Sequence, residues 1–259
     1  MIQNAFAAYH KQQAKSDIMP LSMCVAMSQG YIGYDLQNMI GEELDRRGLG
    51  IHCATVLTQV AVDPADPAFQ HPTKPIGAFM TEEEAKKLAA EKGIDVAEDA
   101  GRGWRQVVAS PRPKEIVEIA TVKALMNAKH AVIAAGGGGI PVVWEDKYHL
   151  KGVPAVIDKD FASECMAEQL DADMLIILTA VEKVAINFGK PDQKGLDDLT
   201  PADARKYIEE KQFAPGSMLP KVQAALSFAE SKPGRVALIT LLEKAADGIS
   251  GKTGTRVHQ

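Results

Sequence analysis

Apolar residues recur at helical intervals in the first part of the chain. Between residues 27 and 47 these positions are Ile32, Leu36, Met39, Ile40 and Leu44. Positions three and four apart share one face of a helix, and Gly48 follows as a stop signal. The chain begins with the same spacing, at Ile2, Phe6 and Ala7, without a capping residue before it. We therefore expect a helix over 27–47 and a start that falls inside another helix.

Strands and helices alternate along most of the remaining chain. The run 52–62 is apolar and rich in β-branched residues, which predicts a strand. After this come predicted helices over 115–128, 160–170, 201–211, 218–231 and about 241–246, and predicted strands over 131–135, 141–144, 174–179 and 236–239. This alternation indicates an α/β fold with a mainly parallel sheet that is covered by helices on both faces.

The segment 63–113 has a different character. Its prolines are Pro64, Pro67, Pro72, Pro75, Pro111 and Pro113, with turn-forming residues around them. One acidic helix is predicted over 81–92, where Thr81 is a suitable N-cap and the carboxylates after it suit the positive end of the helix dipole. A long proline-rich segment with a helix of its own indicates an inserted subdomain or lid.

Composition and charge narrow the class of protein. The 259 residues are 46% hydrophobic and 24% charged, which suits one large α/β domain or one domain with a sizeable insertion. The net charge of −5, without a lysine- or arginine-rich block, argues against nucleic acid or an anionic membrane as the partner. No apolar run reaches the roughly 20 residues that span a bilayer, and the N-terminus lacks the pattern of a secretory signal. We expect a cytoplasmic protein.

The cysteines indicate neither a metal site nor a disulfide framework. Cys24, Cys53 and Cys165 lie far apart, show no metal-ligand spacing and are odd in number. We expect three buried thiols in a reducing compartment and no metal held by side chains.

A run of four glycines directly follows the predicted strand 131–135. Gly136, Gly137, Gly138 and Gly139 would let the backbone approach an anion closely, with N–H groups aimed at it. The alternative is an ordinary tight turn between strands. A dinucleotide-binding fingerprint needs a helix after its glycines, whereas a strand is predicted here, which argues against a nicotinamide dehydrogenase.

Two lysines lie where predicted helices begin. Lys159 stands between Asp158 and Asp160 just before a helix, either as a solvated charge cluster or as a phosphate-binding lysine held by an acidic neighbour. Ser217 is a plausible N-cap for the helix 218–231, which places Lys221 in the first turn. A cation there opposes the helix dipole, and this favours an anion nearby.

A third candidate region follows the predicted strand 174–179. Loops at the carboxyl ends of strands are where α/β sheets bind ligands, so Thr179, Ala180, Val181 and the loop 187–191 are candidates. The alternative is a plain connection between strands.

Several long motifs resemble those of carbamate kinases, a family within the amino-acid kinase superfamily. The matching stretches are 27–34, 62–77, 98–105, 136–142, 156–160, 187–191 (Asn-Phe-Gly-Lys-Pro) and 214–218 (Ala-Pro-Gly-Ser-Met). The resemblance implies an αβα sandwich around an open, mainly parallel sheet. It implies a single amino-acid kinase domain over 1–259, with 63–113 as the lid subdomain that projects over the site.

The resemblance also implies roles for individual residues. Lys159 and Lys221 would neutralise the transferring phosphoryl group, Asp160 would orient them, and Lys74 would reach the carbamoyl phosphate side. The glycine run 136–139 would approach the phosphates. The nucleotide would be framed by Thr179, Ala180, Val181, Asn187, Phe188, Ser217 and Met218. Mg²⁺ would arrive with ATP or ADP, bound through phosphate oxygens and water.

The implied activity is phosphoryl transfer between ATP and carbamate, often used to make ATP from carbamoyl phosphate in arginine catabolism. The implied assembly is a homodimer. Another amino-acid kinase with a carboxylate substrate is a second interpretation, against which Lys74 on the inserted segment argues.

One departure from the family concerns the N-terminus. Members open with a strand, a glycine- and asparagine-containing phosphate loop and a second glycine-asparagine-glycine turn, none of which this sequence contains. We therefore expect the first strand unit to be missing, either because the true start lies upstream of Met1 or because the chain is a fragment. The alternative function is accordingly a truncated, catalytically impaired fragment that binds nucleotide.

Overall fold

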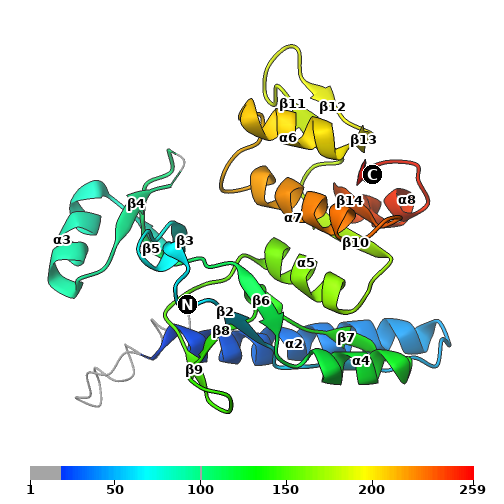
Figure 1. Cartoon of the computed structure of the whole chain (residues 1–259), viewed down its shortest axis with the longest axis horizontal. Helices are drawn as coiled ribbons and strands as arrows, with labels where there is room; N and C mark the ends of the chain where they lie inside the picture. Colours follow the sequence, from blue (N-terminus) through cyan, green and yellow to red (C-terminus); the bar gives the residue numbers. More distant parts are fainter. Residues whose placement is uncertain (1–18, 100) are drawn as a thin grey trace. The chain divides into compact units, whose positions relative to one another are not determined.

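The computed structural model describes residues 19–99 and 101–259, so the helical spacing at Ile2, Phe6 and Ala7 lies outside the described residues. The chain divides into two compact units, Met1–Ala162 and Ser163–Gln259. Figure 1 colours the chain along its sequence, and each unit is described below by itself. Among the described residues, no helix is both long enough and apolar enough to cross a lipid bilayer.

The first unit combines a long helix with short strands that pair both in parallel and antiparallel. Helix α2 (Leu21–Arg46) confirms the predicted helix and begins six residues earlier. Strand β1 (Cys53–Thr55) pairs in parallel with β7 (Ala131–Ile133). The next sheet has the order β6-β2-β8-β9, formed by β6 (Pro113–Ile116), β2 (Gln59–Val62), β8 (Ile140–Trp144) and β9 (Leu150–Gly152).

Two predictions for this unit need correction. The strand predicted over 52–62 is broken into β1 and β2. Residues 56–58 between them lie opposite the longer glycine-containing loop 134–139, which connects the partner strands β7 and β8. The helix predicted over 115–128 begins later, as α4 (Ile119–Asn127). Residues 113–116 instead form β6, which pairs antiparallel with β2.

Close packing joins α2 to β1. The Thr55 hydroxyl donates a hydrogen bond to the Gly33 carbonyl over 3.0 Å. A Cβ on Gly33 would lie only 2.3 Å from Thr55 Cγ2, so a side chain there would force the helix away from the strand. Gly33 thus lets α2 lie directly against the strands that precede the glycine run.

The inserted segment carries its own sheet and helix. Strands β3 (Lys74–Met80), β5 (Trp104–Val108) and β4 (Val96–Glu98) pair antiparallel in that order. Helix α3 (Glu82–Lys92) confirms the predicted acidic helix. Its N-terminus is a capping box, in which Thr81 Oγ1 accepts from the Glu84 amide and a Glu84 carboxylate oxygen accepts from the Thr81 amide.

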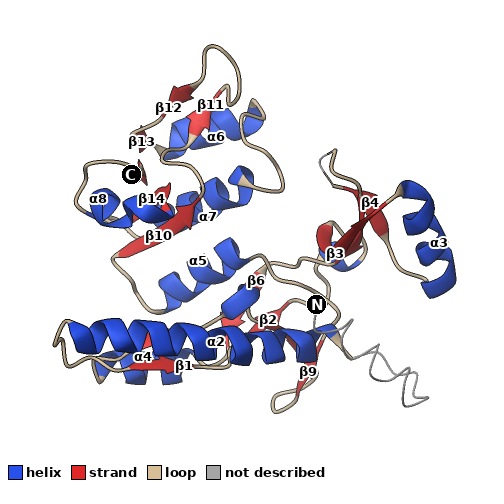
Figure 2. Ribbon diagram, turned by 180° about the vertical axis from the view of Figure 1, so that it is seen from behind, coloured by secondary structure: helices blue, strands red, loops and turns tan. Residues whose placement is uncertain are grey.

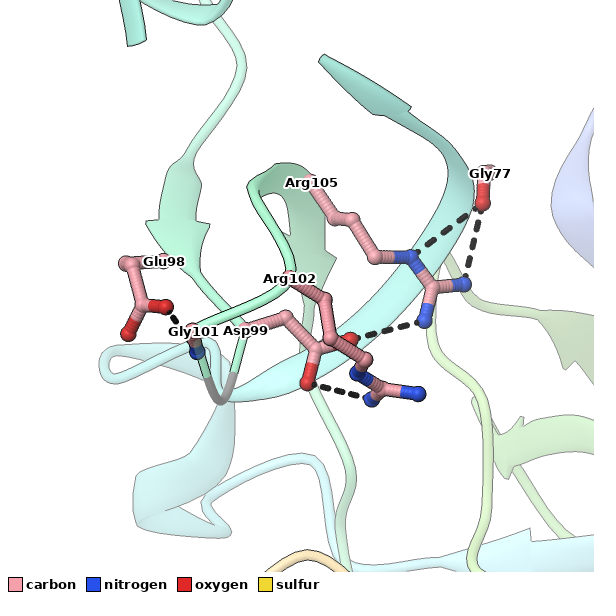
Figure 3. Close-up of polar contacts among 6 residues, drawn as sticks. All are labelled: Gly77, Glu98, Asp99, Gly101, Arg102 and Arg105. Atoms are coloured by element: carbon pink, nitrogen blue, oxygen red, sulfur yellow. Dashed lines mark hydrogen bonds and ion pairs between the residues drawn. The ribbon is translucent and has the colours of Figure 1, made fainter. Parts of the chain in front are cut away.

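An ion cluster fixes the bulge in β3 (Figure 3). Arg105 donates to the Gly77 carbonyl from Nε at 3.2 Å and from Nη2 at 3.0 Å, and its Nη1 lies 3.0 Å from Asp99 Oδ2. Arg102 donates to the other Asp99 oxygen over 2.9 Å. Both guanidinium groups lie about 5 Å from the ring centre of Phe79. Because β3 begins at Lys74, this cluster stabilises the strand that carries a predicted substrate residue.

The cluster predicts a pH-dependent stability of the inserted segment. The hydrogen bond from Arg105, followed by that from Arg102, holds the pKa of Asp99 below its ordinary value. A lowered pKa gives stability that is complete above the unfolded value of about 3.9 and is lost as pH falls through the folded value. We expect Asp99→Asn to speed hydrogen exchange of the β3 and β5 amides at pH 7, with the difference from wild type vanishing at low pH. Glu91→Gln, on the exposed face of α3, is the control; a difference that persists at low pH would contradict the assignment.

The second unit is built around a four-stranded sheet with the order β10-β14-β15-β13. Its strands are β10 (Met174–Thr179), β14 (Val236–Leu241), β15 (Thr255–Val257) and β13 (Asp198–Leu199). The first two are parallel in register Met174↔Val236 to Thr179↔Leu241. A short hairpin pairs β11 (Ala185–Ile186) with β12 (Lys194–Gly195). The predicted strand 174–179 is therefore confirmed, and the strand predicted at 236–239 is two residues longer.

Helices α7 and α8 pack against this sheet, and α6 packs against α7 (Figure 2). Their bounds are Pro201–Glu209 for α6, Met218–Ser231 for α7 and Ala245–Ile249 for α8, which is preceded by the 3₁₀ turn η3 (Leu242–Lys244). Val222, Ala225 and Phe228 on α7 are fully buried, which supplies much of this core. The predicted helix 218–231 is confirmed, whereas the helix predicted near 241–246 begins with the 3₁₀ turn and continues to Ile249. Helix α5 (Lys159–Gln169) runs from the first unit into the second.

Candidate active site

Lys159 is presented at the first position of α5. The preceding Asp158 caps the helix, because its carbonyl accepts from the Ala162 amide over 3.0 Å and its Oδ1 accepts from the Asp160 amide over 2.9 Å. The Lys159 ammonium lies 3.4 Å from Asp160 Oδ2, and its side chain is 64% exposed while that of Asp160 is 6% exposed. A cation thus stands at a helix N-terminus, supported by a buried carboxylate. This arrangement fits contact with a ligand anion better than a packing role.

The glycine run packs against the segment that carries Lys159. It forms a 3₁₀ turn, η2 (Gly136–Gly138), between β7 and β8. A Cβ on Gly138 would lie 2.1 Å from the Ile157 carbonyl oxygen and 3.4 Å from the Lys159 amide nitrogen, and its φ is +98°. Gly139 is equally confined, because a Cβ there would lie 2.1 Å from Val60 Cγ2. Gly138 and Gly139 are therefore glycines because neighbouring atoms leave no room for a side chain.

Gly137 differs from its neighbours. Its φ is +68°, and a Cβ there would meet no atom within 4 Å. It is the member of the run with open space in front of it, which makes it the best placed to approach a phosphate. That contact stays a prediction.

Gln29 holds the glycine loop in place and was not anticipated from the sequence. Its Nε2 donates to the carbonyls of Thr58 and Gly136, each over 3.1 Å, and its Oε1 accepts from the Thr58 amide over 2.8 Å. The Thr58 hydroxyl accepts from the Ala135 amide over 2.9 Å. Gln29 is buried, and a satisfied buried amide fixes its surroundings. The signal in the sequence that could have identified Gln29 is its position as a polar residue inside the motif 27–34.

Lys74, on the inserted segment, contacts Asp158 at the start of α5. Its Nζ lies 2.6 Å from Asp158 Oδ2. Burial alone would raise the pKa of Asp158, but the hydrogen bonds from Lys74 and the Asp160 amide, together with the charge of Lys159, outweigh it and hold this pKa below its ordinary value. The structure thus brings together Lys74, Lys159 and Asp160 through Asp158, for which sequence reasoning assigned no role.

A separate cavity of about 150 Å³ lies in the second unit. It is lined by six of the seven residues predicted to frame the nucleotide: Thr179, Ala180, Val181, Phe188, Ser217 and Met218. Asn187 is not among the lining residues. Its side-chain Nδ2 donates to Asp192 Oδ2 over 2.8 Å, and its backbone N–H donates to Gln212 Oε1 over 2.9 Å. The nucleotide role of Asn187 stays a prediction.

Further lining residues were not predicted: Lys183, Ala185, Gln212, Phe213 and Ala214. Lys183 is the only charged residue among the described residues that line this cavity. Its Nζ lies 2.5 Å from Asp197 Oδ1, and the hydrogen bond to Asp197 raises the pKa of Lys183. The sequence gives little signal for Lys183, because Asp197 lies on a later segment.

The start of α7 partly departs from prediction. Ser217 occupies the N-cap position, but its side chain makes no capping hydrogen bond, so its predicted capping role is wrong. Its φ of −139° and ψ of −82° differ from the usual extended cap conformation. Lys221 lies in the first turn as expected and is only 8% exposed. Lysine is rarely this buried, which supports a specific role for it.

The cysteines and acidic residues give no sign of a metal centre. No group of three or more His, Cys, Asp or Glu side chains suited to hold a metal ion occurs in residues 19–99 and 101–259. Of the three thiols predicted to be buried, Cys165 is buried, whereas the prediction is wrong for Cys24 and Cys53, which are partly exposed. Most described residues of α2 are not buried, and all three residues of β1 are partly exposed.

The comparisons with known proteins give the class of protein. Residues 52–239 match the model of the amino acid kinase family. The architecture agrees, since both units have open sheets with parallel pairs and flanking helices. The chain is thus an amino acid kinase, and the predicted α/β fold of this type is confirmed.

Individual relatives narrow the family. The carbamate kinase-like protein YqeA of Escherichia coli is 61% identical over 259 residues, which cover 100% of this chain and 83% of that protein. The carbamate kinase of Clostridium perfringens is 54% identical over 248 residues, covering 96% of this chain and 79% of that protein. The structure of carbamate kinase from Giardia lamblia bound to AMP-PNP superposes with a TM-score of 0.86 at 44% identity, covering 100% of this chain and 79% of the other. This chain belongs to the carbamate kinase family and is an enzyme, a kinase.

Proposed function

We propose that the protein transfers a phosphoryl group between ATP and carbamate, giving ADP and carbamoyl phosphate, and the reverse. The observation that carries this proposal is the cluster at the start of α5. An exposed Lys159 stands beside the buried Asp160, and Lys74 reaches Asp158 from the inserted segment. The names of the relatives support the same reaction.

The proposed chemistry is an in-line displacement. A carbamate oxygen attacks the γ-phosphorus of ATP, the bond from phosphorus to the ADP oxygen breaks, and ADP leaves with the electron pair. The protein positions the groups and neutralises the phosphoryl oxygens. Lys159 would supply this charge and Asp160 would keep its ammonium oriented. Lys221, buried in the second unit, is the second lysine that we assign to the phosphoryl group.

We propose that the glycine run and Lys74 serve the substrate. Gly137, with open space before it, would offer its amide to a phosphate oxygen. Gly136, Gly138 and Gly139 would hold the loop in the conformation that allows this. Lys74, as the cation that the inserted segment contributes, would bind carbamoyl phosphate.

We further propose that the cavity in the second unit binds the base end of ATP or ADP. Pockets that enclose whole drug-sized ligands measure about 300–1,000 Å³, so a cavity of about 150 Å³ holds only part of a nucleotide. Phe188 offers an aromatic ring and Met218 a polarisable side chain to the base. Mg²⁺ would accompany the phosphates and be bound by their oxygens and by water.

The nucleotide site makes a prediction about Phe188. Its ring lines the cavity and is 65% exposed, so its removal should leave the fold intact. Stacking of a base on an aromatic ring is worth about 1–3 kcal/mol, so Phe188→Ala should raise the KM for ADP roughly tenfold and leave that for carbamoyl phosphate unchanged. Tyr148→Ala, an exposed aromatic of the first unit, is the control. An unchanged KM for ADP would exclude this residue from the site.

We also propose the wider setting that the family resemblance implies. The enzyme would work in the cytoplasm, as a homodimer, and mainly toward ATP formation in arginine catabolism. The inserted segment would act as the lid of a single kinase domain. The pairing of copies is tested by analytical ultracentrifugation of the purified chain.

The choice of acceptor tests the proposed function. ADP release from MgATP is measured with carbamate, formed from ammonia and bicarbonate, and separately with acetate, glutamate and N-acetylglutamate. We expect turnover with carbamate alone. Turnover with another carboxylate would instead indicate a different amino acid kinase. Tight ADP binding without turnover on any acceptor would indicate the alternative function, a catalytically impaired protein that binds nucleotide.

A further inference from the structure

We propose that Asp158 is a positioning residue for this reaction, which holds the Lys74 ammonium at the start of α5. The inference rests on the proposed function, because it concerns how Lys74 of the inserted segment binds carbamoyl phosphate. It adds a residue that acts through Lys74 and not by touching the substrate.

The two oxygens of Asp158 have separate tasks. Oδ1 accepts from the Asp160 amide over 2.9 Å and so caps the helix that carries Lys159. Oδ2 lies 2.6 Å from Lys74 Nζ, across 84 positions of sequence. One carboxylate therefore ties the start of α5 to the first residue of β3. The Asp158 side chain is 12% exposed and that of Lys74 is 33% exposed, so the pair is partly shielded from water.

The charges explain why Asp158 acts through Lys74. A carboxylate repels a phosphate dianion, so Asp158 gains nothing from direct contact with carbamoyl phosphate. A lysine on a long, flexible stem is poorly fixed without a partner. The ion pair gives the Lys74 ammonium one orientation, and its remaining N–H groups stay available to a phosphate oxygen. Preorganisation of the ammonium in this way strengthens ligand binding, because less side-chain freedom is lost when the ligand binds.

The pair also determines where the inserted segment is anchored. Lys74 begins β3, and the ion cluster of Asp99, Arg102 and Arg105 fixes the same strand further along. The Lys74–Asp158 pair connects that strand to the segment that ends in Lys159. Loss of the Asp158 charge would therefore release Lys74 without disturbing the sheet of the inserted segment.

The test compares Asp158→Asn, Lys74→Met and the double variant. Asparagine is as good an N-cap as aspartate, so α5 should keep its cap while the ion pair is lost. We expect each single variant to raise the KM for carbamoyl phosphate about tenfold, the size expected for a charge-assisted hydrogen bond, with the KM for ADP unchanged. The double variant should be no worse than Lys74→Met, because the two residues act as one unit.

A matched control removes an ion pair elsewhere in the same unit. Lys151 Nζ lies 2.7 Å from Glu145 Oε1 in the hairpin of β8 and β9, and both are exposed. Glu145→Gln should leave both KM values unchanged. An Asp158→Asn enzyme with unchanged or lower KM for carbamoyl phosphate, or losses that add in the double variant, would overturn the inference while the proposed function stands. A wild type that neither turns over nor binds carbamoyl phosphate by calorimetry would overturn both.

Discussion

Lys159→Ala is expected to lose roughly 10²–10³-fold or more of the rate of ATP formation, the loss seen when a group that stabilises transition-state charge is removed. The reason is the position of the side chain. It is 64% exposed at the start of α5, with its ammonium beside Asp160, so it contributes charge and little packing. The variant should therefore unfold at the wild-type temperature. Steady-state rates and a thermal unfolding scan measure the two quantities on the same preparation.

Two companion variants sharpen this result. Lys159→Arg keeps the charge but replaces a compact ammonium with a planar fork, and we expect it to recover only part of the lost rate. Lys123→Ala, on the exposed face of α4, should behave as wild type. A folded Lys159→Ala enzyme with normal turnover would contradict the assignment of Lys159.

Gly138→Ala is expected to lower the free energy of unfolding by about 3 kcal/mol and to reduce turnover as well. The new Cβ would lie 2.1 Å from the Ile157 carbonyl oxygen, and a φ of +98° is unfavourable for alanine. The clash is with backbone, so it is relieved only if the segment leading to Lys159 moves. Urea unfolding gives the stability change and the rate of ATP formation gives the functional change.

Gly137→Ala is the matched control for Gly138. It has a similarly positive φ of +68° but open space around the new methyl group. It should cost only about 1 kcal/mol in stability. If Gly137 faces the phosphates as proposed, its main effect is on turnover. Equal losses of stability in the two variants would contradict the packing assigned to Gly138.

Local signals in the sequence predicted the helices best. Thr81 and the carboxylates after it lie within the helix that they define, and α3 forms as expected. The helix predicted over 218–231 also forms with these bounds. Strand limits depend on partners far away in the chain. The run 52–62 is broken because the glycine-containing loop lies opposite residues 56–58, and residues 113–116 become a strand because β2 pairs with them. No local pattern reports these pairings.

In the candidate site, too, features with a local signal were predicted and contacts between distant segments were not. Lys159, Lys221 and the glycine run carry local signals: a cation at a helix start and glycines after a strand. Sequence reasoning missed contacts between distant segments, above all the pair of Lys74 with Asp158. It also missed Gln29, whose amide bonds to carbonyls on two other segments. Ser217 has the right residue type for a cap, but its backbone takes another conformation.

The most direct test of the central claim is ATP formation from carbamoyl phosphate and MgADP, followed by ³¹P NMR. Wild type and Lys159→Ala are purified side by side, so that any kinase carried over from the host contributes equally to both. We predict that the carbamoyl phosphate resonance disappears as the γ-phosphate of ATP grows, and that Lys159→Ala shows almost none of this transfer. A folded wild-type chain that binds ADP but forms no ATP, or equal ATP formation by both proteins, would contradict the account.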